Sequence, residues 1–490
     1  MVCTASTGDV PVRRLALGSD VVDTDVLVAH VADPFRLTIS SGVEDSLRKC
    51  ADEAAAVSAA GAAYGRTTGV GANRNVEADD SDGAHGLRLV RSHTAGGGAD
   101  LGDDVARATM LVRAHQLSRP GSGIPFETFE ALVRATADGR APAVRSFGGV
   151  GTGDITVLGE LALCLLGERP WRDGSSGPYL DAIGANAALA LMSSSAPTLA
   201  VAALAAAELR TLVAASAVVA CLGAVAVRAN AQQWSVAAAA ARPSDASTAV
   251  AARMRRLLDD SAWTPARTQD PFAWRSMPFI LGPALQAGDA LVDEIDRAID
   301  ACAENPRFTD GGVWHHGAFH HTSVALALDT YRLAVTQWLT TSLSRMVKLN
   351  DPAYTGQARF LAHGPAGSSG SMVLEYTAAS ALEDLRHRAH PVTLDTISIS
   401  VGTEDHGSFA WRGALALRES VDAVGALLSC ELLTAVRAVR GADDLTLGSS
   451  VRAILDRCDE LPPPGGDRPL IDELQLARRI LPVLSDLGVG

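Results

Sequence analysis

Five long segments in the second part of the sequence carry apolar residues at helical spacing, and together they predict a helical bundle. The composition agrees, because 47% of the residues are hydrophobic but only 4% are aromatic. Small aliphatic side chains suit closely packed helices, so the predicted fold class is mainly all-α. The segments span residues 181–231, interrupted near 193–197, and residues 283–302, 322–349, 371–387 and 412–440.

The N-terminal part is less regular. Residues 24–40 alternate apolar and polar side chains around Asp33-Pro34, which predicts a short hairpin or small sheet that leads into a helix over residues 41–63. Two further helices are expected at 105–117 and 126–137. Between them, residues 64–98 are rich in Gly, Ser and Asp, and so long an irregular stretch in a compact protein is usually functional or disordered. We interpret this stretch as functional.

These changes of pattern divide the 490 residues into three predicted domains. Residues 1–180 form an N-terminal domain with the irregular loops. Residues 181–440 form the central bundle of long helices. Residues 441–490 form a C-terminal helical tail, in which Pro462-Pro463-Pro464 precedes a final short helix.

Charge and apolar content exclude several classes of partner. A net charge of −14 argues against nucleic acid or an acidic membrane surface. The uncharged run at 211–227 is shorter than the ~20 residues that span a bilayer and is rich in Ala, so we expect a helix buried in a bundle or a subunit interface. Residues 1–14 lack the pattern of a secretory signal. A cytoplasmic protein is therefore expected.

The cysteines agree with this location, because they are far apart in the sequence and predict reduced thiols. They are Cys3, Cys50, Cys164, Cys221, Cys302, Cys430 and Cys458.

Two local patterns could bind a cofactor, and we assign neither that role. The glycine-rich run from Phe147 to Asp154 has no P-loop lysine and no strand–turn–helix context, which argues against nucleotide binding. The pairs His315-His316 and His320-His321 lie at helical spacing that can hold zinc, but no Cys or carboxylate completes a recognised pattern. We therefore predict no metal site.

The strongest functional signal is a series of seven short motifs in a fixed order along the chain. Each motif is weak alone, but a generic bundle would not be expected to carry all seven at sensible spacing. The motifs are Ala63-Tyr64-Gly65-Arg66-Thr67-Thr68-Gly69-Val70-Gly71, Leu89-Val90-Arg91-Ser92-His93-Thr94-Ala95-Gly96, Gly151-Thr152-Gly153-Asp154, Gln269-Asp270-Pro271-Phe272-Ala273-Trp274-Arg275, Glu304-Asn305-Pro306, His316-Gly317-Ala318-Phe319-His320 and Glu404-Asp405-His406.

In this order the motifs resemble those of the aromatic amino acid ammonia-lyases, the family of histidine and phenylalanine ammonia-lyase, over residues 24–440. The resemblance implies a long helical bundle of the ammonia-lyase and fumarase-like type with a small N-terminal strand element. It also implies a homotetramer with active sites built from loops of three chains. Family members form an electrophilic methylidene-imidazolone ring from Ala-Ser-Gly, and a tyrosine removes the proton from the carbon beside the amine.

The resemblance assigns roles to residues that this chain retains. Tyr64 would be the catalytic base if its pKa, normally ~10, is lowered by its surroundings, with His93 beside it and Glu404 in the same group. Arg275 would hold a substrate carboxylate, for which a bidentate guanidinium is suited. The other expected pocket residues are Gln269, Phe272, Phe319 and Ser193.

The chain departs from the family where the ring forms. Gly151-Thr152-Gly153 replaces Ala-Ser-Gly, so cyclisation would at best give an ethylidene whose methyl group hinders attack. Ser193 and Ala318 stand where the family has asparagines, Phe272 replaces a tyrosine, and Thr403 replaces a glutamine. The joint loss of precursor and polar surroundings is expected if no ring forms, because unpaired buried partners would be costly.

Three functional hypotheses follow. The first is a ring-free enzyme that uses tyrosine acid–base chemistry for addition, elimination or cyclisation on a pre-activated small carboxylate, in specialised metabolism. The second is an aromatic amino acid ammonia-lyase or aminomutase with an ethylidene ring. The third is a non-catalytic scaffold, which would tolerate replacement of Tyr64, His93 and Arg275.

Overall fold

The computed structural model describes residues 13–442 and 444–488, and it forms two compact units that are each discontinuous in sequence. Unit 1 comprises the described residues of Met1–Leu204, Asp293–Ala325 and Val392–Leu415, and unit 2 those of Ala205–Val292, Leu326–Pro391 and Ala416–Gly490. The three predicted domains were instead consecutive, and their limits stay a prediction. Cys3 and most of the segment tested for a secretory signal lie outside the described residues.

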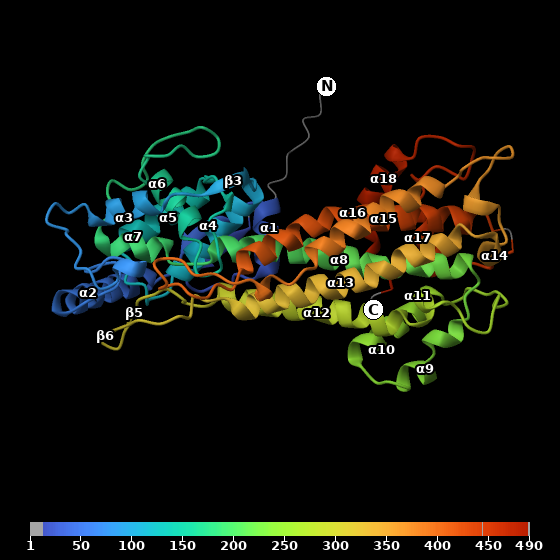
Figure 1. Ribbon diagram of the computed structural model, residues 1–490, viewed down its shortest axis with the longest axis horizontal. Coiled ribbons are helices and arrows are strands. Elements are labelled where there is room, and N and C mark those ends of the chain that lie inside the picture. Colours follow the sequence, from blue (N-terminus) through green and yellow to red (C-terminus); the bar gives the residue numbers. More distant parts are fainter. Residues whose placement is uncertain (1–12, 443, 489–490) are drawn as a thin grey trace, which may run out of the picture. The chain divides into compact units, whose positions relative to one another are not determined.

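Unit 1 combines short helices with three two-stranded sheets (Figure 1). Its helices are α1 (Thr24–Ala32), α2 (Val43–Ala60), α3 (His85–His93), α4 (Asp103–Leu117), α5 (Phe126–Ala137), α6 (Ile155–Leu165) and α7 (Ala185–Met192). Its strands are β1 (Arg14–Leu17), β2 (Arg36–Ile39), β3 (Gly97–Asp100), β4 (Arg145–Phe147), β5 (Arg307–Thr309) and β6 (Gly312–Trp314). The pair β1–β2 is parallel, whereas β3–β4 and β5–β6 are antiparallel.

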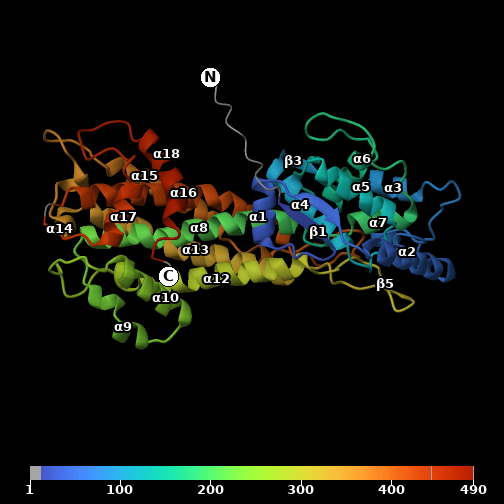
Figure 2. The same cartoon turned by 180° about the vertical axis from the view of Figure 1, so that it is seen from behind.

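Unit 2 is built on four long helices, which also have residues in unit 1: α8 (Ala196–Ala226), α12 (Met277–Ile299), α13 (Thr322–Leu349) and α16 (Ala410–Arg440). They run side by side in both views of the chain (Figures 1 and 2). The shorter helices are α9 (Val236–Ala240), α10 (Asp245–Leu257), α11 (Phe272–Arg275), α14 (Pro352–Thr355), α15 (Met372–Arg388), α17 (Ser449–Arg457) and α18 (Ile471–Leu484). The prediction of a mainly all-α fold with long central helices is confirmed.

Buried polar contacts fix the long helices of unit 2 against one another. The Trp338 indole on α13 donates to the Ser216 hydroxyl on α8 at 2.7 Å. Arg345 on α13 forms a fully buried ion pair with Glu431 on α16, with Nε and Oε1 2.5 Å apart. Breaking a buried pair of this kind costs about 3–5 kcal/mol, because it leaves a charge without a partner. The apolar helix faces therefore pack in one specified register.

One stretch, Ala185–Ala226, is long and apolar enough to cross a membrane, but 83% of its most apolar window is buried within the fold. This stretch contains all but the last residue of the uncharged run at 211–227. Its burial agrees with the expectation of a helix surrounded by other helices.

The predicted hairpin at 24–40 is wrong in its first half. Residues Thr24–Ala32 form α1, and the side chain of Asp23 caps it by accepting the amide hydrogen of Val26 at 2.8 Å. Thr24, Leu27 and His30 are its buried residues, so the burial repeats at helical spacing rather than in alternation. Only β2 is a strand, and it pairs in parallel with β1 instead of forming a hairpin.

The stretch 64–98 is also more regular than expected. His85–His93 forms α3, and Gly97 begins β3. Gly86 explains how α3 can approach α7, because a Cβ there would lie 2.7 Å from the Ala185 nitrogen and still closer to Gly184. Residues 64–84 contain no longer helix than the short 3-10 turn Gly71–Asn73, so the functional interpretation now applies to this shorter loop.

Candidate functional site

The tyrosine loop at residues 63–71 is anchored by a buried arginine. The Arg66 guanidinium donates to the carbonyl oxygens of Ser122 and Gly123 at 3.0 and 2.8 Å and stacks on the Phe308 ring at 4.4 Å. Burial lowers the pKa of Arg66 to about 10. A charged group held by carbonyls and a ring fixes the loop that carries Tyr64.

Tyr64 lies half-buried, with its hydroxyl oxygen accepting the amide hydrogen of Gly71 at 2.7 Å. Gly71 has a φ of +56°, and a Cβ there would overlap Ser400 Oγ and lie 3.6 Å from Glu404 Oε1. Glycine is therefore required for this close approach. The same geometry places the Glu404 carboxylate near the Tyr64 hydroxyl, and the catalytic roles of both residues stay predictions.

The segment 399–409 joins this loop through two more hydrogen bonds. Ser400 Oγ accepts the Ala72 amide hydrogen at 2.9 Å, and the Arg74 guanidinium donates to Thr403 Oγ1 at 2.7 Å. Arg74, Ser400 and Thr403 had no role in the sequence-based site. The tyrosine motif extends almost to Arg74, but its partners lie more than 300 positions away and no spacing rule indicates them.

The surroundings of Tyr64 raise its pKa, contrary to the lowering that a tyrosinate base requires. Burial is the largest cause, and the Glu404 charge adds to it, while the Gly71 amide and the Arg74 charge act in the opposite direction. Tyr64 is therefore a protonated phenol at neutral pH. It can donate a proton directly, and it must first lose its own proton before it can accept one from a substrate carbon.

His93 lies at the C-terminal end of α3, half-buried. Its Nδ1 lies 2.9 Å from the Leu89 carbonyl oxygen and 3.0 Å from Ser92 Oγ. A carbonyl only accepts, so this contact fixes the tautomer with hydrogen on Nδ1 and leaves Nε2 as an acceptor. Helix α3 packs on α6 and α7, which adjoin the tripeptide and Ser193.

The loop after β6 carries Phe319, which is half-buried. This loop contacts the segment 399–409 through His320, whose Nε2 lies 3.0 Å from His406 Nδ1. It also contacts the tyrosine loop, because His315 Nε2 accepts the Tyr64 amide hydrogen at 3.3 Å. The predicted helical spacing of these histidines is wrong, because residues 315–321 are not helical. Among the described residues, no group of three or more His, Cys, Asp or Glu side chains is arranged to hold a metal.

The tripeptide Gly151-Thr152-Gly153 is held by the other end of the same segment. The Ser408 hydroxyl, only 2% exposed, donates to the Gly151 carbonyl at 2.8 Å, and the Phe409 amide donates to the Val150 carbonyl at 3.1 Å. Gly151 has a φ of +82°, and a Cβ there would overlap Ser408 Oγ and lie 2.6 Å from the Phe409 nitrogen. An alanine, the family residue at this position, does not fit.

These residues do not suit the methylidene-imidazolone ring. Ring closure removes the carbonyl oxygen of residue 151 as water, which would leave the buried Ser408 hydroxyl without that acceptor. Thr152 would add a methyl group at the carbon that must stay open to attack.

Ser193 and Asp154 flank the tripeptide. Ser193 Oγ accepts the Asn305 amide hydrogen at 3.4 Å, and the Asp154 amide donates to the Ser194 carbonyl at 2.8 Å. Asp154 Oδ2 accepts the Thr198 amide hydrogen at 2.9 Å, and burial raises the pKa of this carboxyl to about 6. The backbone on both sides of the tripeptide is thus fixed by unit 1 itself.

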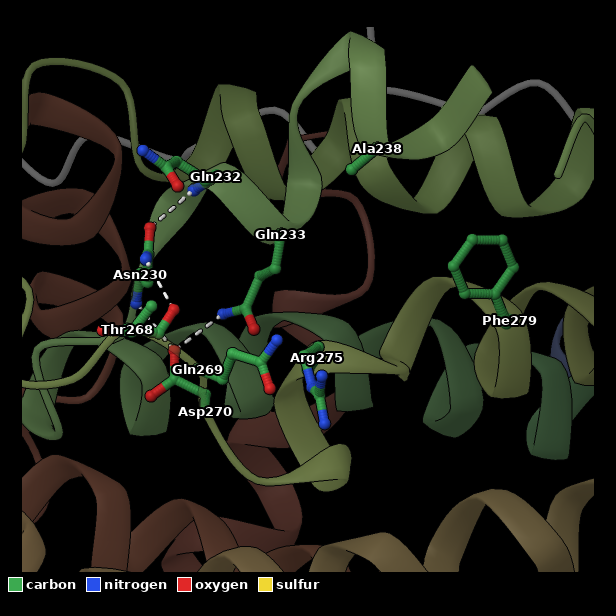
Figure 3. Close-up of a pocket in the computed structure, with 9 residues that line it drawn as sticks. All are labelled: Asn230, Gln232, Gln233, Ala238, Thr268, Gln269, Asp270, Arg275 and Phe279. Carbon is green, nitrogen blue, oxygen red and sulfur yellow. Dashed lines mark hydrogen bonds between the residues drawn. The ribbon is translucent and has the colours of Figure 1, made fainter. Parts of the chain in front are cut away.

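Unit 2 contains a cavity of about 310 Å³ that includes two predicted substrate-binding residues, Gln269 and Arg275 (Figure 3). Phe272 does not line it; this ring is 68% exposed and stacks on the Arg275 guanidinium at 4.7 Å. The full lining is Asn230, Gln232, Gln233, Ala238, Thr268, Gln269, Asp270, Arg275 and Phe279. The residues that the sequence missed include Asn230, Gln232 and Gln233, although they form a polar run shortly after the apolar segment of α8.

The predicted site residues thus fall into two groups. Unit 1 holds Tyr64, His93, Ser193, Phe319 and Glu404 with the tripeptide, and unit 2 holds Gln269, Phe272 and Arg275. Tyr64 and Glu404 are adjacent, and Gln269 and Arg275 line one cavity.

Known proteins share both the sequence pattern and the fold. Residues 22–460 match the family model described as aromatic amino acid lyase. Histidine ammonia-lyase of Symbiobacterium thermophilum is 31% identical over 437 residues, which cover 84% of this chain and 85% of that protein. The Streptomyces coelicolor histidine ammonia-lyase is 30% identical, with 84% of this chain and 86% of that protein covered.

Among solved structures, the ergothioneine-degrading ergothionase of Treponema denticola superposes with a TM-score of 0.88 at 22% identity, covering 96% of this chain and 99% of that one. Tyrosine aminomutase of Streptomyces globisporus gives 0.88 at 21%, covering 96% and 97%. The structural matches bear on the fold alone. The family match confirms the resemblance that the seven motifs predicted.

Proposed function

Because this chain belongs to the aromatic amino acid lyase family, we propose that it is a lyase-type enzyme that transfers a proton through Tyr64 without a prosthetic ring. The observation that carries this proposal is the pairing of two sites. The Tyr64 hydroxyl is fixed on the Gly71 amide beside Glu404, while Gly151 has no space for the alanine of a ring precursor. The acid–base group is retained, and the electrophile is lost.

The substrate must then supply its own activation. Without an electrophile, loss of ammonia from an ordinary amino acid breaks a weakly acidic C–H bond with a poor leaving group. A proton beside a carbonyl, or an unsaturated acceptor, removes that difficulty. The raised pKa of Tyr64 suits proton donation in the addition or cyclisation direction, whereas elimination would require the hydroxyl to lose its own proton to solvent before the phenolate could accept one from the substrate.

Arg275 indicates which charge the substrate carries. Its guanidinium lines the unit 2 cavity, and its Nε atom is buried without a hydrogen-bond partner among the described residues. A bidentate donor of this kind suits a carboxylate. We therefore propose a small carboxylate-bearing substrate, as the sequence predicted.

We propose that the chain forms a homotetramer, and one surface of α13 supports self-association. Leu326, Leu333 and Val347 are 51%, 48% and 48% exposed and lie at heptad spacing. The positions between them along this surface are Thr330, Gln337, Thr340 and Ser344, so the stripe has no charged side chain. Uncharged stripes with alternating spacings of four and three residues pack against other helices.

Light scattering on a size-exclusion column measures the assembly mass of Leu333→Asp, which tests this interface. The control is Val483→Asp, at an exposed position of α18. A smaller assembly is expected for Leu333→Asp only. If both variants keep the wild-type mass, α13 does not form the interface.

The deciding experiment is the intact mass of the purified protein, followed by a substrate screen. We expect an unmodified mass and turnover of activated unsaturated or β-carbonyl carboxylates. Loss of two water molecules localised to Gly151-Thr152-Gly153 would refute the ring-free proposal. It would favour an ammonia-lyase or aminomutase, activities that the names of the similar proteins carry. An unmodified mass, together with a Tyr64→Phe variant that behaves as the wild type in the substrate screen, would favour a non-catalytic scaffold.

A further inference from the structure

The unit 2 cavity contains a hydrogen-bond acceptor that has no partner. The Gln233 carboxamide donates through Nε2 to Asp270 Oδ2 at 3.1 Å. An ionised carboxylate only accepts, so this bond fixes the amide with nitrogen towards Asp270 and Oε1 on the other side. Gln233 Oε1 is buried, and no described residue donates to it. In Figure 3 this side chain reaches from the 3-10 turn Ala231–Trp234 towards Gln269 and Arg275.

The neighbouring amide of Asn230 differs, because its hydrogen-bonding groups are used. Its Nδ2 donates to the Thr268 carbonyl at 3.0 Å, and its Oδ1 accepts the Gln232 amide hydrogen at 3.1 Å. Asn230 therefore shapes the cavity wall, whereas Gln233 has an acceptor left over. A buried acceptor without a partner costs free energy unless something enters the cavity to donate to it.

Charge in the cavity is also left uncompensated at Arg275. Asp270 is the acidic residue of the lining. Its carboxylate already accepts hydrogen bonds from the Arg267 guanidinium at 3.0 Å and from the backbone amide of Asn230 at 2.7 Å. Arg275 is the basic residue of the lining; its guanidinium stacks on the Phe272 ring, and its Nε atom is buried without a hydrogen-bond partner among the described residues. The cavity thus offers a cation for an anion and, separately, an acceptor for a donor.

We infer that Gln233 is a specificity-determining residue, whose Oε1 accepts a hydrogen bond from an N–H or O–H group that the substrate carries near its carboxylate. This inference rests on the carboxylate role proposed above for Arg275. A cavity of about 310 Å³ is of the size that holds a small molecule. A site with a committed acceptor discriminates against analogues without the donor, because binding them leaves the acceptor buried and unpaired.

Three probes separate the two roles in the full-length protein. L-3-phenyllactate has a carboxylate and a hydroxyl donor, 3-phenylpropanoate lacks the donor, and phenyllactamide lacks the charged carboxylate. Dissociation constants come from calorimetry. We expect wild-type protein to bind phenyllactate about fivefold more tightly than phenylpropanoate, the size of a net hydrogen bond, and to bind phenyllactamide more weakly than both.

The matched variants are Gln233→Met and Gln232→Met, which change adjacent residues of the same lining. Gln233→Met should reduce the fivefold preference to about one, and Gln232→Met should keep it. Equal binding of the two acids by the wild type would assign Gln233 Oε1 to water or a neighbouring subunit and overturn the inference. Equal weakening of both acids by Gln233→Met would do the same, because it would show a role only in holding Asp270.

The amide probe reports on the proposed function separately. If phenyllactamide binds as tightly as phenyllactate, Arg275 does not hold a carboxylate, and the proposed substrate class fails whatever Gln233 does. If neither acid binds, both the carboxylate role and the inference fail. A preference for phenyllactate that depends on Gln233, together with weak binding of the amide, supports both.

Discussion

The surroundings of Tyr64 and the cavity of unit 2 differ in how far the chain satisfies its own polar groups. Around Tyr64, hydrogen bonds from Ala72 and Arg74 connect two loops, and the hydroxyl oxygen already accepts the Gly71 amide hydrogen. In the cavity, Gln233 Oε1 and Arg275 Nε are buried without partners among the described residues. The protein satisfies the polar groups of the first region itself, whereas we propose that a ligand completes the second. Under that proposal, catalytic positioning and substrate recognition are separate tasks.

Removal of the Tyr64 hydroxyl tests the preorganised region and should have the largest effect. Tyr64→Phe is expected to lower turnover of the identified substrate about 100- to 10,000-fold, because a positioned acid–base group contributes that much. Tyr376→Phe, on a 70% exposed tyrosine, should leave turnover unchanged. Steady-state kinetics measure both. A Tyr64→Phe enzyme within twofold of wild type would mean that this region positions nothing catalytic.

Asp270 is a residue of the cavity lining whose carboxylate already has hydrogen-bond partners within the protein, and its loss should lower the stability of the fold. Asp270→Ala leaves the Asn230 backbone amide without its acceptor and removes the carboxylate from Arg267, which keeps the Val227 carbonyl, so we expect a decrease of about 3 kcal/mol in the free energy of unfolding. Asp259→Ala, at an exposed acid, should change it by less than about 0.5 kcal/mol. Denaturant titrations measure both, and equal values would show that Asp270 does not organise the cavity.

Two glycines with similar backbone angles test how tightly the tripeptide is packed. Gly151 and Gly402 have φ values of +82° and +78°, but only Gly151 has neighbours within 4 Å of an added Cβ. Gly402→Ala should cost about 1 kcal/mol from the left-handed conformation alone. Gly151→Ala should cost about 2 kcal/mol more, because the methyl overlaps Ser408. Thermal unfolding compares them. A Gly151→Ala protein as stable as Gly402→Ala would show that the segment accepts the family residue.

The smallest effects should be opposite displacements of the pH–rate profile. Glu404 raises the pKa of Tyr64 and Arg74 lowers it. Glu404→Gln should therefore lower that pKa and move the Tyr64 limb of the profile to lower pH, whereas Arg74→Met should move it to higher pH. Arg74→Lys keeps the charge and should keep the profile. Displacement of both variants in the same direction would mean that another group titrates.

Much of the fold could be predicted because helical periodicity is a local property. Residues 322–349 and 126–137 form α13 and α5 with the expected limits, since each helix buries one apolar face over many turns. The segment 24–40 was misread because its apolar residues are too closely spaced to separate a period of two from one near three and a half. The structure shows a helix there, because the Asp23 side chain caps its first turn and every third residue from Thr24 to His30 is buried.

By itself, the sequence determined the family and the long helices, because these depend on residue types in a fixed order and at a regular spacing. The site roles of Tyr64, Glu404, Gln269 and Arg275 stay predictions. Only the tertiary structure decided which polar groups have hydrogen-bond partners and where a side chain has space. Arg74 and Thr403 are 329 positions apart, yet they join the loops around Tyr64. Ser408 meets Gly151 across 257 positions and leaves no space for an alanine. Hydrogen-bond partners and free volume depend on where distant segments meet, and no local pattern records that.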